Sequence, residues 1–235
     1  MCGRFVVARS AEELVDALGV DQVGPDLPPP SFNVAPTAQA AIVLDSAKTE
    51  PATRRLESAR WGLVPPWAKD PSIGVKAFNA RSEEVEAKPM FRSALVSRRA
   101  VVPTSGYYEW KTTPEGKTPH YIHPADDEPL FLAGLYEWWK NPSPAGDESP
   151  WLLSFTVLTR DAIGPLGSIH DRMPLFLDSD FADAWLDPHT DNVGDLLDAA
   201  IDAAPDLAQT LVAPVVSRDV GNVRNDSPAL LDPIA

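Results

Sequence analysis

Residues 101–158 carry a succession of short apolar and aromatic segments that are separated only by turn-forming sequences. These segments span residues 101–102, 107–110, 118–122, 130–138 and 152–158. Because β-branched and aromatic residues favour extended backbone, the pattern predicts a run of mostly antiparallel strands. Further strands are expected at residues 4–8, 40–44, 55–62 and 211–216.

Helical patterns are fewer and lie outside this run. Ser10 and Glu13 form a capping-box pair at the start of a short amphipathic helix, which Gly19 is expected to end. Further helices are predicted at residues 82–88, 179–186 and 192–203. The proline-rich stretch 24–36 is expected to be an ordered loop. Because the strands outnumber the helices and do not alternate with them, the predicted class is α+β, with a curved or barrel-like sheet core and a few peripheral helices.

The length and composition indicate one soluble domain. A chain of 235 residues can bury a full core, and we find no internal repeat or dividing linker, so a single domain over residues 1–235 is expected. No apolar run approaches the roughly 20 residues of a membrane helix, and the N-terminus lacks the apolar region of a secretory signal. One cysteine excludes an internal disulfide. The sequence thus predicts a cytoplasmic monomer.

The net charge of −14 is unevenly distributed. Residues 1–110 hold 13 basic and 13 acidic side chains, whereas residues 151–235 hold 4 arginines against 14 aspartates. Nucleic-acid-binding proteins usually show a basic surface, so a polyanionic ligand requires these arginines to cluster in space. The simpler interpretation is a solvated acidic face with ordinary surface arginines.

Several common functional motifs are absent. The chain contains no GxGxxG, GxxxxGK[ST], HExxH or GxSxG pattern. One cysteine and four scattered histidines do not make a conventional zinc site. We therefore expect no metal and no nucleotide cofactor.

The position of the only cysteine is the most informative functional feature. Cys2 follows the initiator methionine and is small enough for Met1 to be removed, which would leave an α-amine and a thiol on adjacent carbons. Their ordinary pKa values, about 7.7–8.0 and about 8.5, make both partly nucleophilic at neutral pH. Such a pair traps aldehydes, because the amine forms a Schiff base and the thiol then closes a thiazolidine ring. The alternative is a chance cysteine with no chemical role.

Three other segments carry polar groups that this chemistry could use. Asn79 and Arg81 lie two residues apart and can share one face of an extended segment. Glu109 stands between aromatic residues, where a carboxylate suits general acid–base use, and His170 lies near Arg172 before a proline. Each residue also has an ordinary structural explanation: a turn or cap for Asn79, a rim ion pair for Glu109 and a hydrogen-bonded histidine for His170.

Six short motifs occur in a characteristic order. They are MCGRF at residues 1–5, FNVAP at 32–36, WGLVP at 61–65, NARSE at 79–83, GYYEW at 106–110 and HDRMP at 170–174. Together they resemble the SOS response-associated peptidase (SRAP) family, the abasic-site processing proteins. The tail VSRDVGN at residues 216–222 resembles the last motif of this family more loosely, and Ser105 stands where the family often has aspartate.

This resemblance implies an α+β SRAP fold, single-stranded DNA as partner and covalent crosslinking to abasic sites in the DNA damage response. Cys2 would attack C1′ of the ring-opened deoxyribose and form the thiazolidine. Asn79 would hydrogen-bond the adduct and help position Cys2, and Glu109 would shuttle protons. His170 would assist sugar ring opening, β-elimination or reversal of the crosslink.

The resemblance also implies a DNA-binding surface. Arg4, Arg81 and Arg172 would hold flanking phosphates, and Trp67 with Pro36 would wedge or stack beside the lesion. The protein would be nucleoid-associated while bound to DNA. Two alternatives stay open: a peptidase with Cys2 as N-terminal nucleophile, including removal of its own Met1, and a non-covalent single-strand binder in which Cys2 is incidental.

Overall fold

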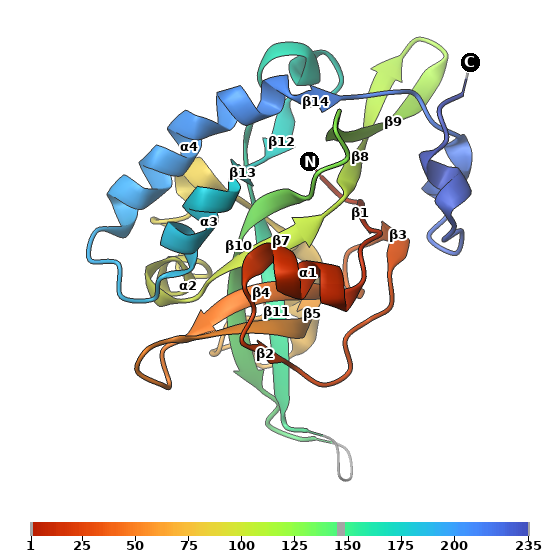
Figure 1. Ribbon diagram of the computed structural model, residues 1–235. Helices are drawn as coiled ribbons and strands as arrows, with labels where there is room; N and C mark the ends of the chain where they lie inside the picture. The colour runs from red at the N-terminus through yellow and green to blue at the C-terminus, as the bar shows by residue number, and fades with distance from the viewer. Residues whose placement is uncertain (1, 145–148, 235) are drawn as a thin grey trace.

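The computed structural model describes residues 2–144 and 149–234, and within them five strands close into a barrel (Figure 1). These strands are β4 (Gln39–Ser46), β5 (Thr53–Trp61), β7 (Arg99–Thr104), β10 (Leu130–Lys140) and β11 (Trp151–Asp161). Antiparallel pairing runs in the order β5, β4, β7, β10, β11. The ring closes where β11 pairs in parallel with β5, with Phe155 opposite Trp61. The predicted α+β class with a barrel-like, mostly antiparallel core is therefore confirmed.

A second antiparallel sheet carries the N-terminal segment. It contains β1 (Phe5–Val7), β3 (Ser31–Val34), β8 (Gly106–Thr113), β9 (Gly116–Pro124) and β14 (Leu211–Val212), in the order β14-β9-β8-β1-β3. Because β7 and β8 are consecutive strands that belong to different sheets, the chain passes from the barrel into this sheet at Ser105. The first strand thus lies between β3 and β8, close to the barrel.

Four short strands extend the barrel sheet. They are β2 (Gln22–Val23), β6 (Asn79–Arg81), β12 (Arg172–Pro174) and β13 (Phe176–Leu177). Strand β6 pairs in parallel with β11 and places Asn79 opposite Val157. Strand β12 pairs antiparallel with β11, with Pro174 opposite Thr159. Two segments with polar motifs therefore meet the same end of β11.

The helices lie around the barrel and mostly match the expected positions. Helix α1 (Ala11–Leu18) has the Ser10–Glu13 capping box, and Gly19 adopts the left-handed conformation after it. Helices α3 (Ser179–Leu186) and α4 (Val193–Gln209) begin after the side-chain caps Asp178 and Asn192. Neither is apolar along its whole length, and no helix in the described ranges is long and apolar enough to cross a membrane.

Two predictions of local structure are wrong. Residues 82–88 form a single 3₁₀ turn (Ser82–Glu84) rather than a helix, because Arg81 supplies no side-chain cap and Pro89 cannot continue a helix. The helix is instead α2 (Arg92–Ser97). The stretch 24–36 is not all loop, because residues between its prolines form β3, where Val34 pairs with Phe5.

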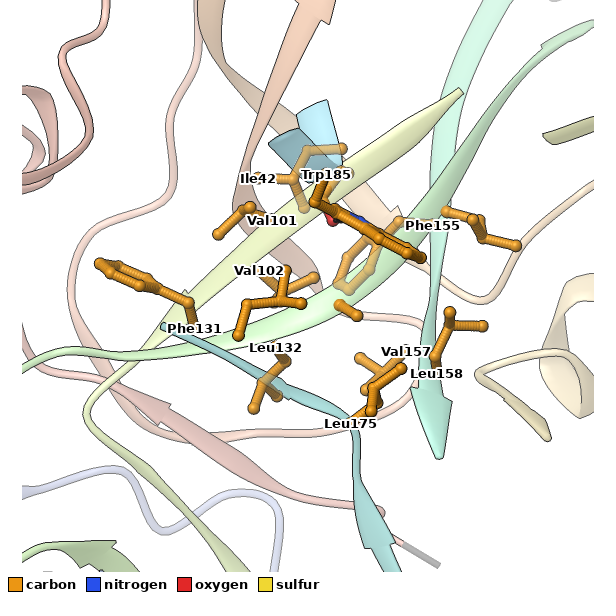
Figure 2. Close-up of a cluster of buried hydrophobic side chains, with 14 of the residues drawn as sticks. Ile42, Val101, Val102, Phe131, Leu132, Phe155, Val157, Leu158, Leu175 and Trp185 are labelled. Atoms are coloured by element: carbon orange, nitrogen blue, oxygen red, sulfur yellow. Dashed lines mark hydrogen bonds between the residues drawn. The ribbon is translucent and has the colours of Figure 1, made fainter. Parts of the chain in front are cut away.

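Buried apolar side chains from the barrel strands and from α3 form one core cluster, part of which Figure 2 shows. Trp185 of α3 is fully buried over this cluster, and its indole nitrogen donates to the Ala100 carbonyl at 3.0 Å. Trp61 is also fully buried, and its ring lies 4.7 Å from that of Phe5. The indole nitrogen of Trp61 donates to the Phe78 carbonyl at 2.8 Å, which ties the core to the residue before Asn79.

Gly62 should be a position where alanine is costly. It has a φ of 132°, and a Cβ there would lie 2.4 Å from the carbonyl oxygen of Gly74. We expect Gly62→Ala to lower the free energy of unfolding by about 3 kcal/mol, through backbone strain and a steric clash. The matched control is Gly116→Ala, which has a φ of 120° and no neighbour within 4 Å, so it carries the strain alone. Equal losses for the two variants in urea titrations would contradict this explanation.

Candidate active site

Cys2 lies three residues before β1, and its side chain is fully buried. Its carbonyl oxygen accepts a hydrogen bond of 2.6 Å from Nδ2 of Asn79, and its Sγ donates to the Arg4 carbonyl at 3.7 Å. The antiparallel pairing of Phe5 with Tyr107 brings the residues before β1 alongside Glu109 of β8. Three of the predicted site residues, Cys2, Asn79 and Glu109, are therefore brought together.

The electrostatics of this cluster keep the thiol neutral. Burial raises the pKa of the Cys2 thiol far above its usual range, and the negative charge of Glu109 raises it further. The pKa of the neighbouring Tyr107 is raised by burial first and then by Cys2 and Glu109. Glu109 itself is 5% exposed. The buried Cys2 thiol therefore stays protonated at neutral pH, next to the buried side chain of Glu109.

Asn79 has hydrogen-bonding capacity left over. While its Nδ2 donates to Cys2, its Oδ1 is buried and has no hydrogen-bond partner among the described residues. A buried acceptor without a partner is destabilising, so such atoms often mark the place of an incoming ligand. Asn79 could accept a hydrogen bond from a group that arrives beside Cys2.

His170 lies in the segment between a 3₁₀ turn (Gly164–Ser168) and β12. Its Nδ1 is 3.0 Å from the backbone nitrogen of Arg172, which donates to it, and 2.7 Å from a carboxylate oxygen of Asp171. These contacts orient the ring from within its own segment. Because β6 and β12 both pair with the same end of β11, the His170 and Asn79 segments flank one strand. A role for His170 at Cys2 stays a prediction.

The three arginines predicted to hold phosphates have different environments. Arg172 is buried, and its guanidinium donates to both carboxylate oxygens of Glu83, at 2.8 and 2.9 Å. Arg4 is half-buried and donates to Asn33. Arg81 is exposed and lies only 3.6 Å from Glu84, a loose surface pair. Arg81 is thus the most accessible of the three for a phosphate, and phosphate contacts for all three stay predictions.

Trp67 is 59% exposed on the loop that follows β5. This loop is anchored where the indole nitrogen of Trp139 donates to the Ala68 carbonyl at 2.7 Å. Beside Trp67 lies an open groove of about 720 Å³, whose lining also contains Lys69 and Lys76. The lining also includes Asp70 and Ala77, the latter two residues before Asn79. Pro36 is half-buried after β3. An exposed aromatic ring with two lysines is suited to a base and its phosphates.

The comparison with protein families matches residues 1–223 to the model described as SOS response associated peptidase (SRAP). The chain belongs to the SRAP family. The resemblance predicted from six motifs is therefore confirmed over nearly the whole chain.

Two curated relatives of this SRAP chain extend over nearly its full length. YoqW of Bacillus subtilis is 36% identical over 243 residues that cover 99% of each chain. YedK of Escherichia coli is 31% identical over 239 residues that cover all of both. Each is named an abasic site processing protein. A crystal structure of a Bacteroides thetaiotaomicron protein has a TM-score of 0.82 at 21% identity over the whole of both chains, which shows the same fold.

Two residues with prominent contacts at this SRAP site were not singled out from the sequence. Glu83 pairs with Arg172 across 89 positions, and Asn33 contacts Arg4 across 29. Both stand inside the quoted motifs, at the end of NARSE and in FNVAP. Membership in a motif was the only available signal, because both contacts depend on strand pairing far along the chain.

Proposed function

We propose that this protein binds single-stranded DNA and links Cys2 covalently to the aldehyde of an abasic site. Support comes from its family, whose relatives YoqW and YedK are named abasic site processing proteins. The observation that carries the proposal is the contact of Cys2 with Asn79 beside the buried Glu109. Capture of an aldehyde needs the amine and thiol of Cys2, an amide to orient them and a carboxylate to relay protons. Asn79 and Glu109 supply the last two groups.

The reaction begins with hydrolysis of the Met1–Cys2 peptide bond, which frees the α-amine. The amine adds to C1′ of the ring-opened deoxyribose, and loss of one water molecule gives the imine. The thiol sulfur then forms a bond to the same carbon, and its proton passes to the nitrogen. Because burial raises the pKa of the thiol, the amine acts first and the thiol gives up its proton only as the ring closes.

Each neighbouring group has a role in this sequence. Glu109 relays the protons that leave the amine and the thiol, and Asn79 orients Cys2 through its carbonyl. His170 assists sugar ring opening and reversal of the crosslink. Arg81 holds a flanking phosphate, while Trp67 and Pro36 stack beside the lesion. The protein acts as a cytoplasmic monomer that is nucleoid-associated while bound.

The test is electrophoresis under denaturing conditions after mixing the protein with matched oligonucleotides. We expect a slow-migrating adduct with a single strand that contains one abasic site, and none with the undamaged strand. An adduct of equal yield with both strands, or no adduct at all, would contradict the proposal. Equal affinity for both strands without an adduct would instead support a non-covalent single-strand binder.

A second candidate is an N-terminal cysteine peptidase, which the description of the family itself favours. Removal of Met1 by the protein itself is compatible with both functions. Cleavage of a peptide in trans, lost on alkylation of Cys2 and unaffected by abasic DNA, would favour the peptidase.

Arg81 provides a separate test of the DNA-binding surface. We expect Arg81→Ala to weaken binding of undamaged single strands and to reduce the slope of log affinity against log salt by about 0.7, the value for one lost phosphate contact. Arg92→Ala, which removes an exposed arginine from α2, is the matched control and should leave the slope unchanged. Fluorescence anisotropy at several salt concentrations measures both slopes. Identical slopes for the two variants would remove Arg81 from the binding surface.

A further inference from the structure

The N-terminal segment is tied to the C-terminal tail by the side chain of Arg4. Its Nη1 donates to Oδ1 of Asn33 at 2.9 Å and to the carbonyl of Val220 at 2.7 Å. Its Nη2 donates to the carbonyl of Gly221 at 3.3 Å. The residues joined by this guanidinium are up to 217 positions apart in the chain. The Arg4 side chain therefore joins the N-terminal segment directly to the C-terminal tail.

Asn33 completes this contact from β3. Its side-chain amide, in a residue only 5% exposed, donates to the carbonyls of Val220, Asn222 and Asn225 at 3.2, 3.1 and 2.8 Å. An amide can accept from a guanidinium with its oxygen while it donates to carbonyls with its nitrogen. A carboxylate would repel these carbonyls, and an apolar side chain would leave them without their donor. The position thus requires both halves of the amide.

The tail has its own anchors on the same sheet. Asp226 accepts a hydrogen bond of 2.5 Å from the backbone nitrogen of Phe32, and Val220 packs with Val6 and Tyr108 in a small buried cluster. In Figure 1 the blue C-terminal segment lies beside β3 and β9, on the side of the molecule where β1 begins. The carbonyls that face Arg4 and Asn33 are consequently fixed in place.

The backbone of Arg4 is bound to the other side of the site. Its carbonyl oxygen accepts from the backbone nitrogen of Tyr108 at 2.9 Å and from Sγ of Cys2 at 3.7 Å. Restraint on the Arg4 side chain is therefore passed to the two residues before it. A nucleophile held by a short N-terminal segment gains from such restraint, because misplacement of about 1 Å can cost about 100-fold in rate.

We infer that Asn33 is a positioning residue for Cys2. Together with Arg4 and the carbonyls of Val220, Gly221, Asn222 and Asn225 it forms a tail latch that holds the N-terminal segment against Glu109. Its place in catalysis rests on the proposed function, whereas its effect on the location of Cys2 does not. The tail latch also changes the expectation for Arg4, which acts mainly by restraint rather than as a phosphate ligand.

The first experiment measures alkylation of the free protein by iodoacetamide, which reports on Cys2 because it is the only cysteine. We expect Asn33→Ala to speed alkylation by at least about tenfold, because it removes the charge-assisted hydrogen bond from Arg4 together with three hydrogen bonds to the tail carbonyls and so favours local opening. Arg4→Met removes the same contact while it keeps the apolar stem, and it should give a similar increase. Two variants keep the test valid if one of them fails to fold.

The matched control is Leu230→Ala, which loses packing in the same tail cluster as Val220 but removes no hydrogen bond of the tail latch. We expect its alkylation rate to stay within about twofold of the native value, because the variant loses apolar contacts but keeps the hydrogen bonds that restrain Cys2. Equal acceleration in Leu230→Ala and Asn33→Ala would overturn the inference, since general loosening would then explain both.

The second experiment measures crosslinking to abasic single strands as a function of DNA concentration. For Asn33→Ala we expect a maximal rate about 100-fold lower with an unchanged half-saturating concentration, because the tail latch positions the nucleophile and does not bind DNA. The double variant with Arg4→Met should be no slower than the single variants, since both remove one unit. A change in half-saturating concentration alone would contradict the positioning role.

The two proposals can fail separately. If the native protein forms no adduct, the proposed function fails, and alkylation still decides whether the tail latch holds Cys2. If the native protein crosslinks and Asn33→Ala matches it in maximal rate and in alkylation, only the inference about Asn33 is wrong.

Discussion

Cys2→Ser is expected to abolish the denaturation-resistant adduct with abasic single-stranded DNA. The serine variant keeps the α-amine and can form the imine, but oxygen closes a ring that hydrolyses readily, so no stable product accumulates. Cys2→Ala also keeps the amine, and reduction with borohydride should trap its imine. Quantitative gels with and without borohydride measure both species.

The control for this experiment is the folded state of the variants. Cys2 is fully buried, and a serine hydroxyl there costs about 1–3 kcal/mol if it finds no hydrogen-bond partner. Thermal unfolding must therefore show that both variants are folded at the assay temperature. If folded Cys2→Ser crosslinks as stably as the native protein, the sulfur does not take part and the thiazolidine is excluded.

Glu109→Gln is expected to slow crosslinking by about 100-fold to 10,000-fold, the usual contribution of a positioned acid or base. The glutamine has the same shape but cannot relay protons from the amine and the buried thiol. Binding of an undamaged strand should be unchanged, because Glu109 is nearly inaccessible. Single-turnover rates at saturating DNA measure the chemical step.

The matched control for Glu109 is Glu137→Gln. Glu137 is a buried carboxylate on β10 that is 4% exposed and pairs with Arg98, outside the cluster around Cys2. Loss of this pair is expected to lower stability without slowing the chemical step. If the two glutamine variants crosslink at the same rate, Glu109 has no special part in proton transfer.

Local sequence signals predicted the elements whose causes are local. The Ser10–Glu13 capping box and Gly19 predicted the ends of α1. The helices expected at residues 179–186 and 192–203 correspond to α3 and α4, although α4 extends to Gln209. Strand β3 was not predicted because the many prolines of residues 24–36 led us to expect a loop throughout. The residues between these prolines nevertheless pair with β1. Closure of the barrel by parallel pairing of β11 with β5 depends on strands about a hundred positions apart, for which a sequence pattern carries no signal.

For the candidate site, too, the sequence identified residues but not their long-range contacts. Residue type and motif were sufficient to select Cys2, Asn79 and Glu109, which the fold brings together. The roles expected of Arg172 and Arg4 depend on their partners, and those partners could not be inferred. Glu83 binds the guanidinium of Arg172, and the tail carbonyls bind that of Arg4. Arginine in a motif indicates a charge-assisted contact but does not say whether protein or ligand provides it.

Intact mass spectrometry of the protein before and after mixing with an abasic oligonucleotide is the decisive test of aldehyde capture by Cys2. We predict that the purified protein lacks Met1 and that the product has the mass of one protein plus one oligonucleotide less one water. The native protein should show this product, and Cys2→Ser should not. A crosslinked protein that still carries Met1 would contradict the account, because its α-amine would not be that of Cys2.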